Sequence, residues 1–388
     1  MDSTLFVLQG GGPTAVINAT LAGIAEQASG RFNRLIGLRH SFEGHKDGQL
    51  LDLSYLLDGA ACAKSLNRLS KTPGALLGSS RKKVEEQDIA NVLDLIKNAG
   101  SDSLIGIGGN GTMAALDVLA DLAASKGHNL KVIGVPKTVD NDLPNVHIAP
   151  GYGSAARFVA MAVRDYDRDF RAMETFDDVT ILETMGRDSG WIAAASVLLK
   201  EGDTAPHMVL LPERPVDEAK FLQQVCALKK EFGRVFIVTN EMLNASTGGP
   251  VGESFQNGPT DGLGRKMYSL SLGTGNYLAQ LIWAELGLQA RCLRPGNLGR
   301  AMSFCVSEPD RLLANRIGRA ATVAIQEASA TQDMITVDAD LSFGTQPLKD
   351  CTGQRHVPER FLSSCPIGIS TEFYAYGREA IGPVTPLF

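Results

Sequence analysis

The sequence predicts an α/β fold with two doubly wound, Rossmann-like domains whose sheets are mainly parallel. Several short apolar runs lack polar alternation, which is typical of strands that are buried on both faces. Segments of helical period lie between these runs, for example Ile89–Ala99 and Thr112–Ser125. Strands that alternate with helices indicate a parallel sheet covered on both sides. The length of 388 residues exceeds what one hydrophobic core usually serves, so more than one domain is expected.

Six apolar runs are predicted to be strands, and several of them end in glycine or polar turn residues. The runs are Leu5–Leu8, Leu104–Ile107, Val132–Val135, Val179–Leu182, Met208–Leu211 and Val235–Val238. In doubly wound sheets, ligands bind at the carboxyl ends of the strands. The residues that follow these runs are therefore the candidates for a binding site.

The second half of the chain is predicted to hold two further helices, Asn276–Leu286 and Leu312–Ala328. A polar, glycine-rich stretch at Asn244–Gly264 is expected to form a long loop. The segment from Asp338 onward contains five prolines and is predicted to be irregular. We expect a first α/β domain at residues 1–140, a second at 141–320, and a C-terminal segment at 321–388 that packs back on both.

Composition and charge narrow the classes of function. The net charge of −6 argues against a general nucleic-acid binder, although a local cluster of basic residues can still attract an anionic small molecule. The six cysteines form no Cys-x-x-Cys pair, and the six histidines show no metal-ligand spacing. The first residues do not resemble a signal peptide, and the longest apolar run, Trp191–Leu199, is shorter than a membrane span. We therefore expect a cytoplasmic protein with free thiols, no nucleic-acid partner and no membrane partner.

Two glycine-rich turns follow predicted strands, at Gly10–Gly12 and Gly108–Thr112. Glycines allow bare backbone N–H groups to approach a ligand, and the positive end of a following helix favours phosphate. The Thr112 hydroxyl is expected to cap the second of these helices. A tight turn without a ligand is the alternative, but two such turns in one sheet favour phosphate binding. The candidate phosphate-binding residues here are Gly11, Gly12, Gly109, Asn110, Gly111 and Thr112.

The loop Pro136–Asp142 carries the clearest chemical signal. Asp140 and Asp142 would point to the same side if the backbone were extended, and Lys137 supplies a cation beside them. A carboxylate next to an acceptor hydroxyl can take its proton, and a lysine can neutralise charge on a transferred group. A solvated turn with charged residues is the alternative interpretation.

Two further groups of basic residues would suit anions. One is the segment Gly78–Lys83, which includes Arg81 and Lys82, and the other contains Arg291, Arg294 and Arg300. Guanidinium groups bind phosphate through paired hydrogen bonds. A solvated helix start and surface salt bridges are the respective alternatives.

The loop Pro-Lys-Thr-Val-Asp-Asn-Asp at 136–142, together with Met185-Gly186-Arg187 and the two glycine turns, resembles the 6-phosphofructokinase family over nearly the whole chain. Three further segments look most like the short bacterial pyrophosphate-dependent branch. They are Pro150–Arg157, Leu211–Arg214 and His356–Pro358.

The resemblance implies transfer of a phosphoryl group from ATP or pyrophosphate to the 1-hydroxyl of fructose 6-phosphate, assisted by Mg²⁺. It implies that residues 1–140 bind the donor and residues 141–320 bind the sugar phosphate. It also implies a homodimer or homotetramer in which some sugar-phosphate contacts cross between subunits.

The resemblance further implies roles for single residues. Asp140 would be the catalytic base, with Lys137 and Arg81 beside the transferred group, and weak metal contacts would come from Asn110 and Asp140. The implied substrate-binding residues are Thr138, Asp142, Met185, Gly186, Arg187, Glu241, Arg291, Asn297 and Arg300. The implied donor-binding residues are Arg81, Lys82 and those of the two glycine turns.

Three positions depart from the family pattern. Gly111 stands where similar pyrophosphate-dependent members carry Asp, so it leaves room for ATP. Asn110 stands where ATP-dependent members carry a magnesium-linked Asp. Asp178 falls where a cation usually faces the 6-phosphate, and a carboxylate there would repel that phosphate. Two alternatives therefore stay open: the same chemistry on another sugar phosphate or a polyol, or a non-catalytic sugar-phosphate-binding subunit.

Overall fold

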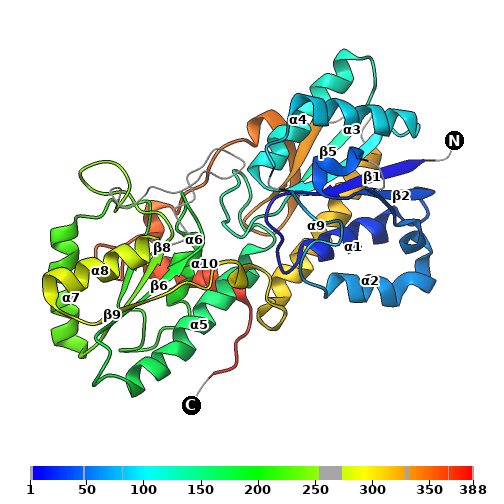
Figure 1. Ribbon diagram of the computed structural model, residues 1–388. Helices are drawn as coiled ribbons and strands as arrows, with labels where there is room; N and C mark the ends of the chain where they lie inside the picture. The colour runs from blue at the N-terminus through cyan, green and yellow to red at the C-terminus, as the bar shows by residue number, and fades with distance from the viewer. Residues whose placement is uncertain are drawn as a thin grey trace. The chain divides into compact units, whose positions relative to one another are not determined.

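Two sheets with mainly parallel strands organise the chain (Figure 1), which confirms the predicted α/β class. The computed structural model describes residues 3–46, 49–80, 82–252, 273–327, 332–365 and 367–386. One compact unit comprises Met1–Ser154 and Arg300–Gly353, and the other comprises Ala155–Gly299 and Gln354–Phe388. We refer to them as unit 1 and unit 2.

The sheet of unit 1 has seven strands in the order β11-β10-β5-β4-β1-β2-β3. Its strands are β1 (Thr4–Gln9), β2 (Arg34–Leu38), β3 (Leu50–Asp52), β4 (Ser103–Gly108), β5 (Lys131–Pro136), β10 (Gln332–Val337) and β11 (Phe343–Pro347). The edge strands β3 and β11 pair antiparallel with their neighbours, whereas the strands between them run parallel. All residues of the central strands β1 and β4 are buried, as expected for strands covered on both faces.

Helices cover both faces of this sheet (Figure 1). They are α1 (Ile17–Ala28), α2 (Ala63–Ser70), α3 (Glu86–Asn98), α4 (Asn110–Ser125) and α9 (Glu308–Glu327). Helices α1 and α9 pack with their backbones close together, because Gly23 and Gly318 lie at the contact. A Cβ at either glycine would overlap a carbonyl oxygen of the facing helix, that of Asn315 or Thr20. This close packing ties residues after 300 to the start of the chain.

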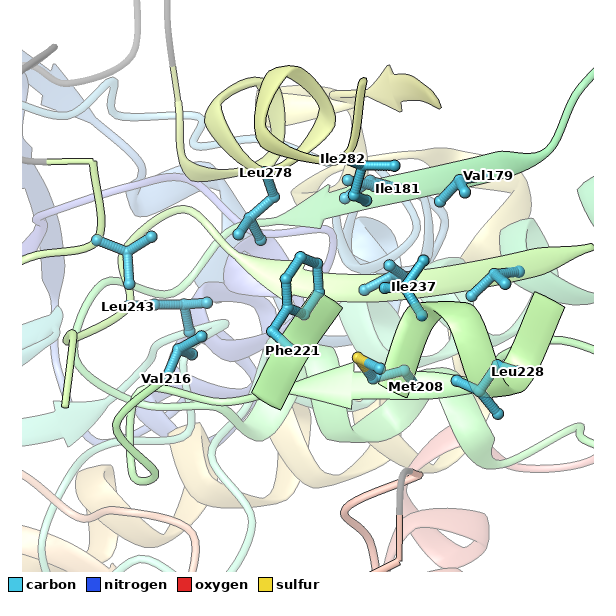
Figure 2. Close-up of a cluster of buried hydrophobic side chains, with 13 residues drawn as sticks. Val179, Ile181, Met208, Val216, Phe221, Leu228, Ile237, Leu243, Leu278 and Ile282 are labelled. Carbon is cyan, nitrogen blue, oxygen red and sulfur yellow. The ribbon is translucent and has the colours of Figure 1, made fainter. Parts of the chain in front are cut away.

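The sheet of unit 2 has four parallel strands in the order β7-β8-β6-β9. Its strands are β6 (Val179–Thr184), β7 (Met208–Leu210), β8 (Val235–Asn240) and β9 (Ala290–Leu293). The helices of this part of the chain are α5 (Tyr152–Ala172), α6 (Trp191–Ala194), α7 (Glu218–Phe232), α8 (Thr274–Leu286) and α10 (Thr371–Ile381). Figure 2 shows the core between the sheet and helices α7 and α8, where Phe221, Ile237 and Leu278 meet.

The C-terminal segment belongs to both units, but it is less irregular than its prolines predicted. Residues up to Gly353 stay with unit 1 and the rest with unit 2, so the unit bounds differ from the expected 140 and 320. The prediction of an irregular chain after Asp338 is wrong, because β11 and α10 lie there. Strand β11 contains a glycine and ends on a proline, as an edge strand can. Tertiary contacts therefore decide the structure of this segment.

An aromatic cluster holds the end of the chain on unit 2. The Trp191 side chain is 1% exposed, and its ring contacts those of Phe361, Phe373 and Tyr376. Its indole N–H donates to the carbonyl oxygen of Arg355 over 3.1 Å.

Among the described residues, no helix is both long enough and apolar enough to cross a membrane. All six cysteines are free.

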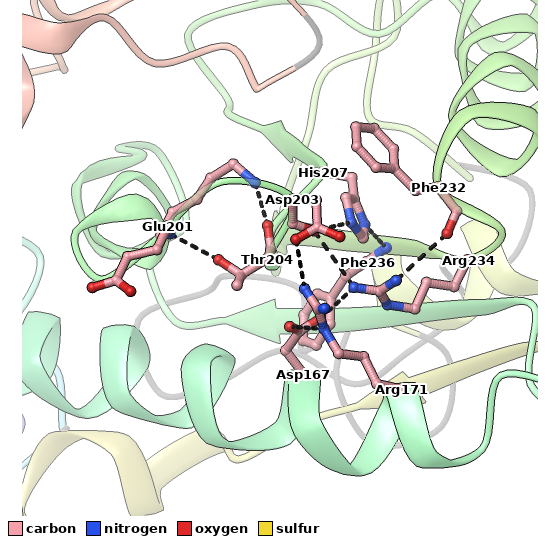
Figure 3. Close-up of polar contacts among 10 residues, drawn as sticks. Asp167, Arg171, Glu201, Asp203, Thr204, His207, Phe232, Arg234 and Phe236 are labelled. Atoms are coloured by element: carbon pink, nitrogen blue, oxygen red, sulfur yellow. Dashed lines mark hydrogen bonds and ion pairs between the residues drawn. The ribbon is translucent and has the colours of Figure 1, made fainter. Parts of the chain in front are cut away.

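A buried polar cluster links α5 with the starts of β7 and β8 (Figure 3). Asp167 accepts from Arg171 over 2.8 Å and faces Arg234 at 3.5 Å. His207 accepts from the backbone N–H of Phe236 through Nδ1 over 2.8 Å, so its proton resides on Nε2. Burial, reinforced by the charge of Lys200, lowers the pKa of His207 to about 4. The imidazole is therefore neutral in the folded protein at neutral pH.

We predict that this histidine makes the stability of the protein fall in mild acid. The unfolded chain binds a proton on His207 near pH 6.5, whereas the folded chain binds it only near pH 4. The contribution of His207 to the free energy of unfolding is therefore complete above pH 6.5. This contribution decreases by about 3 kcal/mol in total as the pH falls toward 4. Denaturant unfolding from pH 7 to pH 4.5 measures the effect. His207→Asn should show a shallower pH dependence, and parallel curves for the two proteins would contradict the prediction.

Candidate functional site

Three of the predicted loops meet at one edge of the unit 1 sheet. Strands β1, β4 and β5 are adjacent and parallel, so their carboxyl ends lie side by side. The N–H of Gly10 donates to the carbonyl of Ile107 over 2.8 Å, and the N–H of Lys137 donates to that of Gly108 over 2.9 Å. The two glycine turns and the Pro136–Asp142 loop are thus directly connected through their backbones.

The glycines of these turns are required by close packing. A Cβ at Gly10 or at Gly108 would overlap the side chain of Thr112. Thr112 lies in the first turn of α4, which begins at Asn110 without a side-chain cap. The expectation that the Thr112 hydroxyl caps this helix is therefore wrong, because the side chain fills the space that the two glycines leave.

Only one of the two helices starts directly at its glycine turn. Helix α4 begins at Asn110, so its positive end and free N–H groups lie at the second turn. Helix α1 begins at Ile17, and four residues separate it from Gly12. A helix therefore follows the first glycine turn, as predicted, but it starts four residues after the turn. Backbone N–H groups of the glycines, and not the start of α1, are what the first turn offers to a ligand.

The Lys137 side chain reaches the first glycine turn. Its residue is 2% exposed, and Nζ donates to the carbonyl oxygen of Gly12 over 2.8 Å. Gly11 has a φ of +73°, and a Cβ there would come within 3.2 Å of this Nζ. A buried ammonium group therefore lies beside a partly exposed glycine turn, which is suited to an anion.

The loop after Lys137 is bent at Asn141, so the condition of an extended backbone between Asp140 and Asp142 is not met. Asn141 has a φ of +54°, a left-handed conformation that asparagine tolerates. The Thr138 hydroxyl accepts from the N–H of Asp140 over 3.1 Å and donates to Asp142 Oδ1 over 3.1 Å. Asp142 Oδ2 accepts from the amide of Asn110 over 3.2 Å. Asp142 therefore supports the loop, and Asp140 is the second carboxylate at this edge of the sheet.

Asn110 and Gly111, at the start of α4, affect which metal and which phosphate donor could bind. Asn110 Oδ1 is buried without a hydrogen-bond partner, an orphaned oxygen at the carboxyl edge of the sheet. Gly111 is exposed, and a Cβ there would have nothing within 4 Å. The start of α4 thus offers an oxygen that suits Mg²⁺ and leaves open space next to it.

The predicted basic segment is described only in part. Arg81 lies outside the described residues. Lys82 Nζ is 3.2 Å from Asp88 Oδ2 at the start of α3, and this pairing raises the pKa of Lys82. The Ser79 hydroxyl donates to the carbonyl of Gly11, so this segment contacts the first glycine turn.

A second group of predicted residues meets at the carboxyl edge of the unit 2 sheet. Met185–Arg187 follows β6 and Glu241 follows β8, and these strands are adjacent and parallel. Arg187 Nε lies 3.8 Å from Glu241 Oε1. Gly186 has a φ of +106°, and its carbonyl accepts from the amide of Asn240 over 2.7 Å. The structure therefore brings these residues together, as expected.

A cavity of about 540 Å³ lies beside Arg187 within unit 2. Its wall includes Asp188, Glu213 and the segment that contains His356 and Val357. Glu213 Oε1 accepts from the N–H of Gly190 and from that of Val357, each over 2.9 Å. The C-terminal segment thus forms part of the site wall, a contribution that the sequence did not predict.

Arg291 and Asp178 lie at the opposite, amino-terminal end of β6. Arg291 donates to Asp177 over 2.8 Å, and Asp178 is paired with Lys229 at 2.6 Å. Burial alone would raise the pKa of Asp178, but the hydrogen bonds from Lys229 and the backbone hold it below its ordinary value. Six strand residues of about 3.3 Å each separate this end from the Met185–Arg187 loop. Within one chain these two residues are therefore not part of that loop cluster.

The remaining arginines occupy different places. Arg294 follows β9, and its Nε donates to the buried Glu183 of β6 over 2.8 Å. Ligand-binding residues follow the ends of parallel strands, so its position directly after β9 would have marked Arg294 if that strand had been predicted. Asn297 is exposed in unit 2, whereas Arg300 belongs to unit 1 and its carbonyl accepts from the N–H of Ala15 over 3.0 Å.

A protein-family model and several known proteins are similar to this chain. A family model described as Phosphofructokinase matches residues 4–325. A pyrophosphate--fructose 6-phosphate 1-phosphotransferase of Xanthomonas campestris is 33% identical over 100% of this chain and 93% of that protein. A sulfofructose kinase of Alkalicoccus urumqiensis is 31% identical over 91% of this chain and 90% of that protein.

An ATP-dependent 6-phosphofructokinase of Streptomyces coelicolor is also similar, with 31% identity over 80% of this chain and 84% of that protein. The crystal structure of a pyrophosphate-dependent phosphofructokinase from Nitrosospira multiformis matches with a TM-score of 0.84 and 28% identity, over 100% of this chain and 94% of that one. Because the family model covers most of the chain and the relatives align along nearly their whole lengths, the chain belongs to the phosphofructokinase family.

Proposed function

We propose that this chain transfers a phosphoryl group from ATP or pyrophosphate to the 1-hydroxyl of fructose 6-phosphate, which gives fructose 1,6-bisphosphate. One observation carries the proposal: the ammonium of Lys137 contacts Gly12 at the edge where both glycine turns and the Asp140 loop meet. Phosphoryl transfer depends mainly on positioning and on neutralising charge, and this edge supplies groups for both. The free cysteines favour a cytoplasmic setting.

The donor side is proposed to use neutral and positive groups of unit 1. Backbone N–H groups of Gly11, Gly12 and Gly109 and the start of α4 would bind the phosphates. Lys137 would neutralise charge that develops on the transferred group. Arg81 and Lys82 would extend this site, and Thr112 would support it by filling the space between the turns.

We propose the following roles for residues that would bind the acceptor. Asp140 would take the proton of the 1-hydroxyl as general base, with Thr138 and Asp142 fixing its loop. The sugar would bind to the loop Met185–Arg187 and to Glu241. Asn297, Arg300 and Arg291 would serve the 6-phosphate, Arg291 from a neighbouring subunit of a homodimer or homotetramer.

A magnesium ion fits the residues present only if the donor supplies most ligands. The described residues contain no group of three or more His, Cys, Asp or Glu side chains that would hold a metal. Asn110 Oδ1 is the buried oxygen that would face the ion, with Asp140 close along the same edge. The ion supplies charge neutralisation on the donor phosphates.

The purified protein should form fructose 1,6-bisphosphate with at least one of the two donors, measured as initial rates side by side with Mg²⁺ present. Asp140→Asn keeps the side-chain volume but removes the base, so kcat should fall by more than about a hundredfold. Asp94→Asn, which changes a half-exposed carboxylate on α3, is the control and should retain full activity. No product with either donor would reject the function, and an active Asp140→Asn variant would reject the role of Asp140.

Gly111→Asp should suppress ATP use and spare pyrophosphate use. The new side chain meets no protein atom at Cβ, so it will fold without strain and occupy the open space beside the α4 start. Gly111→Ala is the matched control, because its methyl group is too small to fill that space. The ratio of kcat/KM for the two donors is the measurement. Equal ratios in wild type and Gly111→Asp would show that this position does not select the donor.

A second candidate acceptor carries a sulfonate in place of the 6-phosphate. Asp178 occupies a position where the family resemblance places a cation, and the relative from Alkalicoccus urumqiensis is named a sulfofructose kinase. A sulfonate bears one negative charge and a phosphate nearly two at neutral pH, so a nearby carboxylate repels the sulfonate less. Because Asp178 lies away from the Met185–Arg187 loop in its own chain, this argument applies to an acceptor bound by a neighbouring subunit.

Asp178→Arg should raise kcat/KM for fructose 6-phosphate relative to 6-deoxy-6-sulfofructose by about tenfold, since it replaces a repulsive contact by an attractive one. Lys229→Ala is the control for simple loss of the Asp178–Lys229 pair. Competition between the two acceptors in one assay gives the ratio directly. An unchanged ratio in Asp178→Arg would exclude a contact between this position and the acceptor.

A further inference from the structure

Asp310 is a buried carboxylate in the first turn of α9 that the proposed reaction does not use. The residue is 2% exposed. Its carboxylate accepts three hydrogen bonds: from the N–H of Gly151 over 2.8 Å, from the N–H of Ser154 over 2.9 Å and from the Ser154 hydroxyl over 2.6 Å. All three donors are neutral, so no cation in this set compensates the charge.

These bonds hold the beginning of helix α5. The helix starts at Tyr152, so the N–H groups of Gly151 and Ser154 are among those that a helix leaves unsatisfied at its start. The first turn of α5 itself contains no acidic residue. The Ser154 hydroxyl also accepts from the N–H of Ser307 over 3.2 Å, which links the start of α5 to the residues before α9. Asp310 therefore acts as the capping carboxylate of α5 from another element of the chain.

The same start of α5 supports the loop that carries Asp140. Gly151 forms a parallel bridge with Thr138, whose N–H donates to the carbonyl of Pro150 over 3.2 Å. The N–H of Ala149 donates to Asn141 Oδ1 over 2.9 Å. Residues on either side of Asp140 are thus bound to the segment 149–151, which ends where Asp310 holds it.

This supporting segment has little room to move. Gly151 has a φ of +109°, and a Cβ there would come within 2.6 Å of Thr14 Cγ2, in the residues that follow the first glycine turn. The segment therefore lies between the donor turn and the Asp140 loop. A shift at the start of α5 would be passed to both, because Gly151 packs against Thr14 and is bridged to Thr138.

We propose that Asp310 is a positioning residue for phosphoryl transfer, which holds Asp140 in place through Gly151 and Thr138. The role rests on the proposed function. The bond to Gly151 fixes the segment that supports the Asp140 loop, as well as the start of α5. Burial raises the pKa of Asp310 to about 6, although its three hydrogen bonds oppose this shift.

Asp310→Asn keeps the volume of the side chain but places an N–H group where one of the donors now binds. We expect kcat to fall at least about tenfold, because a small displacement of a reacting group is costly. KM for fructose 6-phosphate and for the donor should stay within about threefold, because the residue touches neither. Ser154→Ala removes only one of the three bonds, so it should show a smaller fall in kcat of the same kind.

Asp217→Asn is the matched control. Asp217 caps α7 by accepting from the N–H of Lys220 over 3.1 Å, in unit 2 and without a bond to the Asp140 loop. It should leave kcat unchanged. Hydrogen exchange gives a readout apart from activity: amides of residues 138–142 should exchange faster in Asp310→Asn and not in Asp217→Asn.

The results separate this role from the function itself. A folded Asp310→Asn variant with wild-type kcat would overturn the role and leave the proposed function intact. An equal loss of kcat in Asp217→Asn would also overturn it, because general helix destabilisation would then explain the effect. If Asp310→Asn does not fold, unchanged kcat and exchange in Ser154→Ala overturn the role. A wild-type chain that is inactive with both donors rejects the function, and with it the role.

Discussion

The contact between the Lys137 ammonium and the Gly12 carbonyl is the interaction on which the proposed site depends. It requires that β1 and β5, each one strand away from β4, end at the same height, and the parallel register of the sheet ensures this. It also requires glycines at the turns, because Thr112 and Lys137 occupy the space that side chains would take. A small set of steric constraints thus places a cation, two glycine turns and a carboxylate loop at one edge.

In the proposed function, the two units would bind different parts of the reactants. Unit 1 presents cations, glycine turns and the start of α4, which suit a chain of phosphates. Unit 2 presents the paired Arg187 and Glu241, which suit the hydroxyl groups and charge of a sugar. In each unit the relevant residues follow adjacent parallel strands, as expected for this class of sheet.

Several charged residues near the site are already bound to protein groups, and this affects which of them can act. Asp142 is bound by Thr138 and Asn110, and Lys82 is paired with Asp88. Such residues hold loops in place. The Asp310 carboxylate is an extreme case, because it is buried and distant in sequence from the loop that it supports.

The sequence by itself determined the α/β class, six of the described strands and the residues after them, because buried parallel strands leave apolar runs. Only the tertiary structure decided which of these residues meet. Arg291 and Asp178 lie near β6, the strand that Arg187 follows, but at its other end. The hydrogen bonds of Asp310 join positions more than 150 residues apart. Such long-range contacts depend on how helices and strands pack, which no local pattern in the sequence encodes.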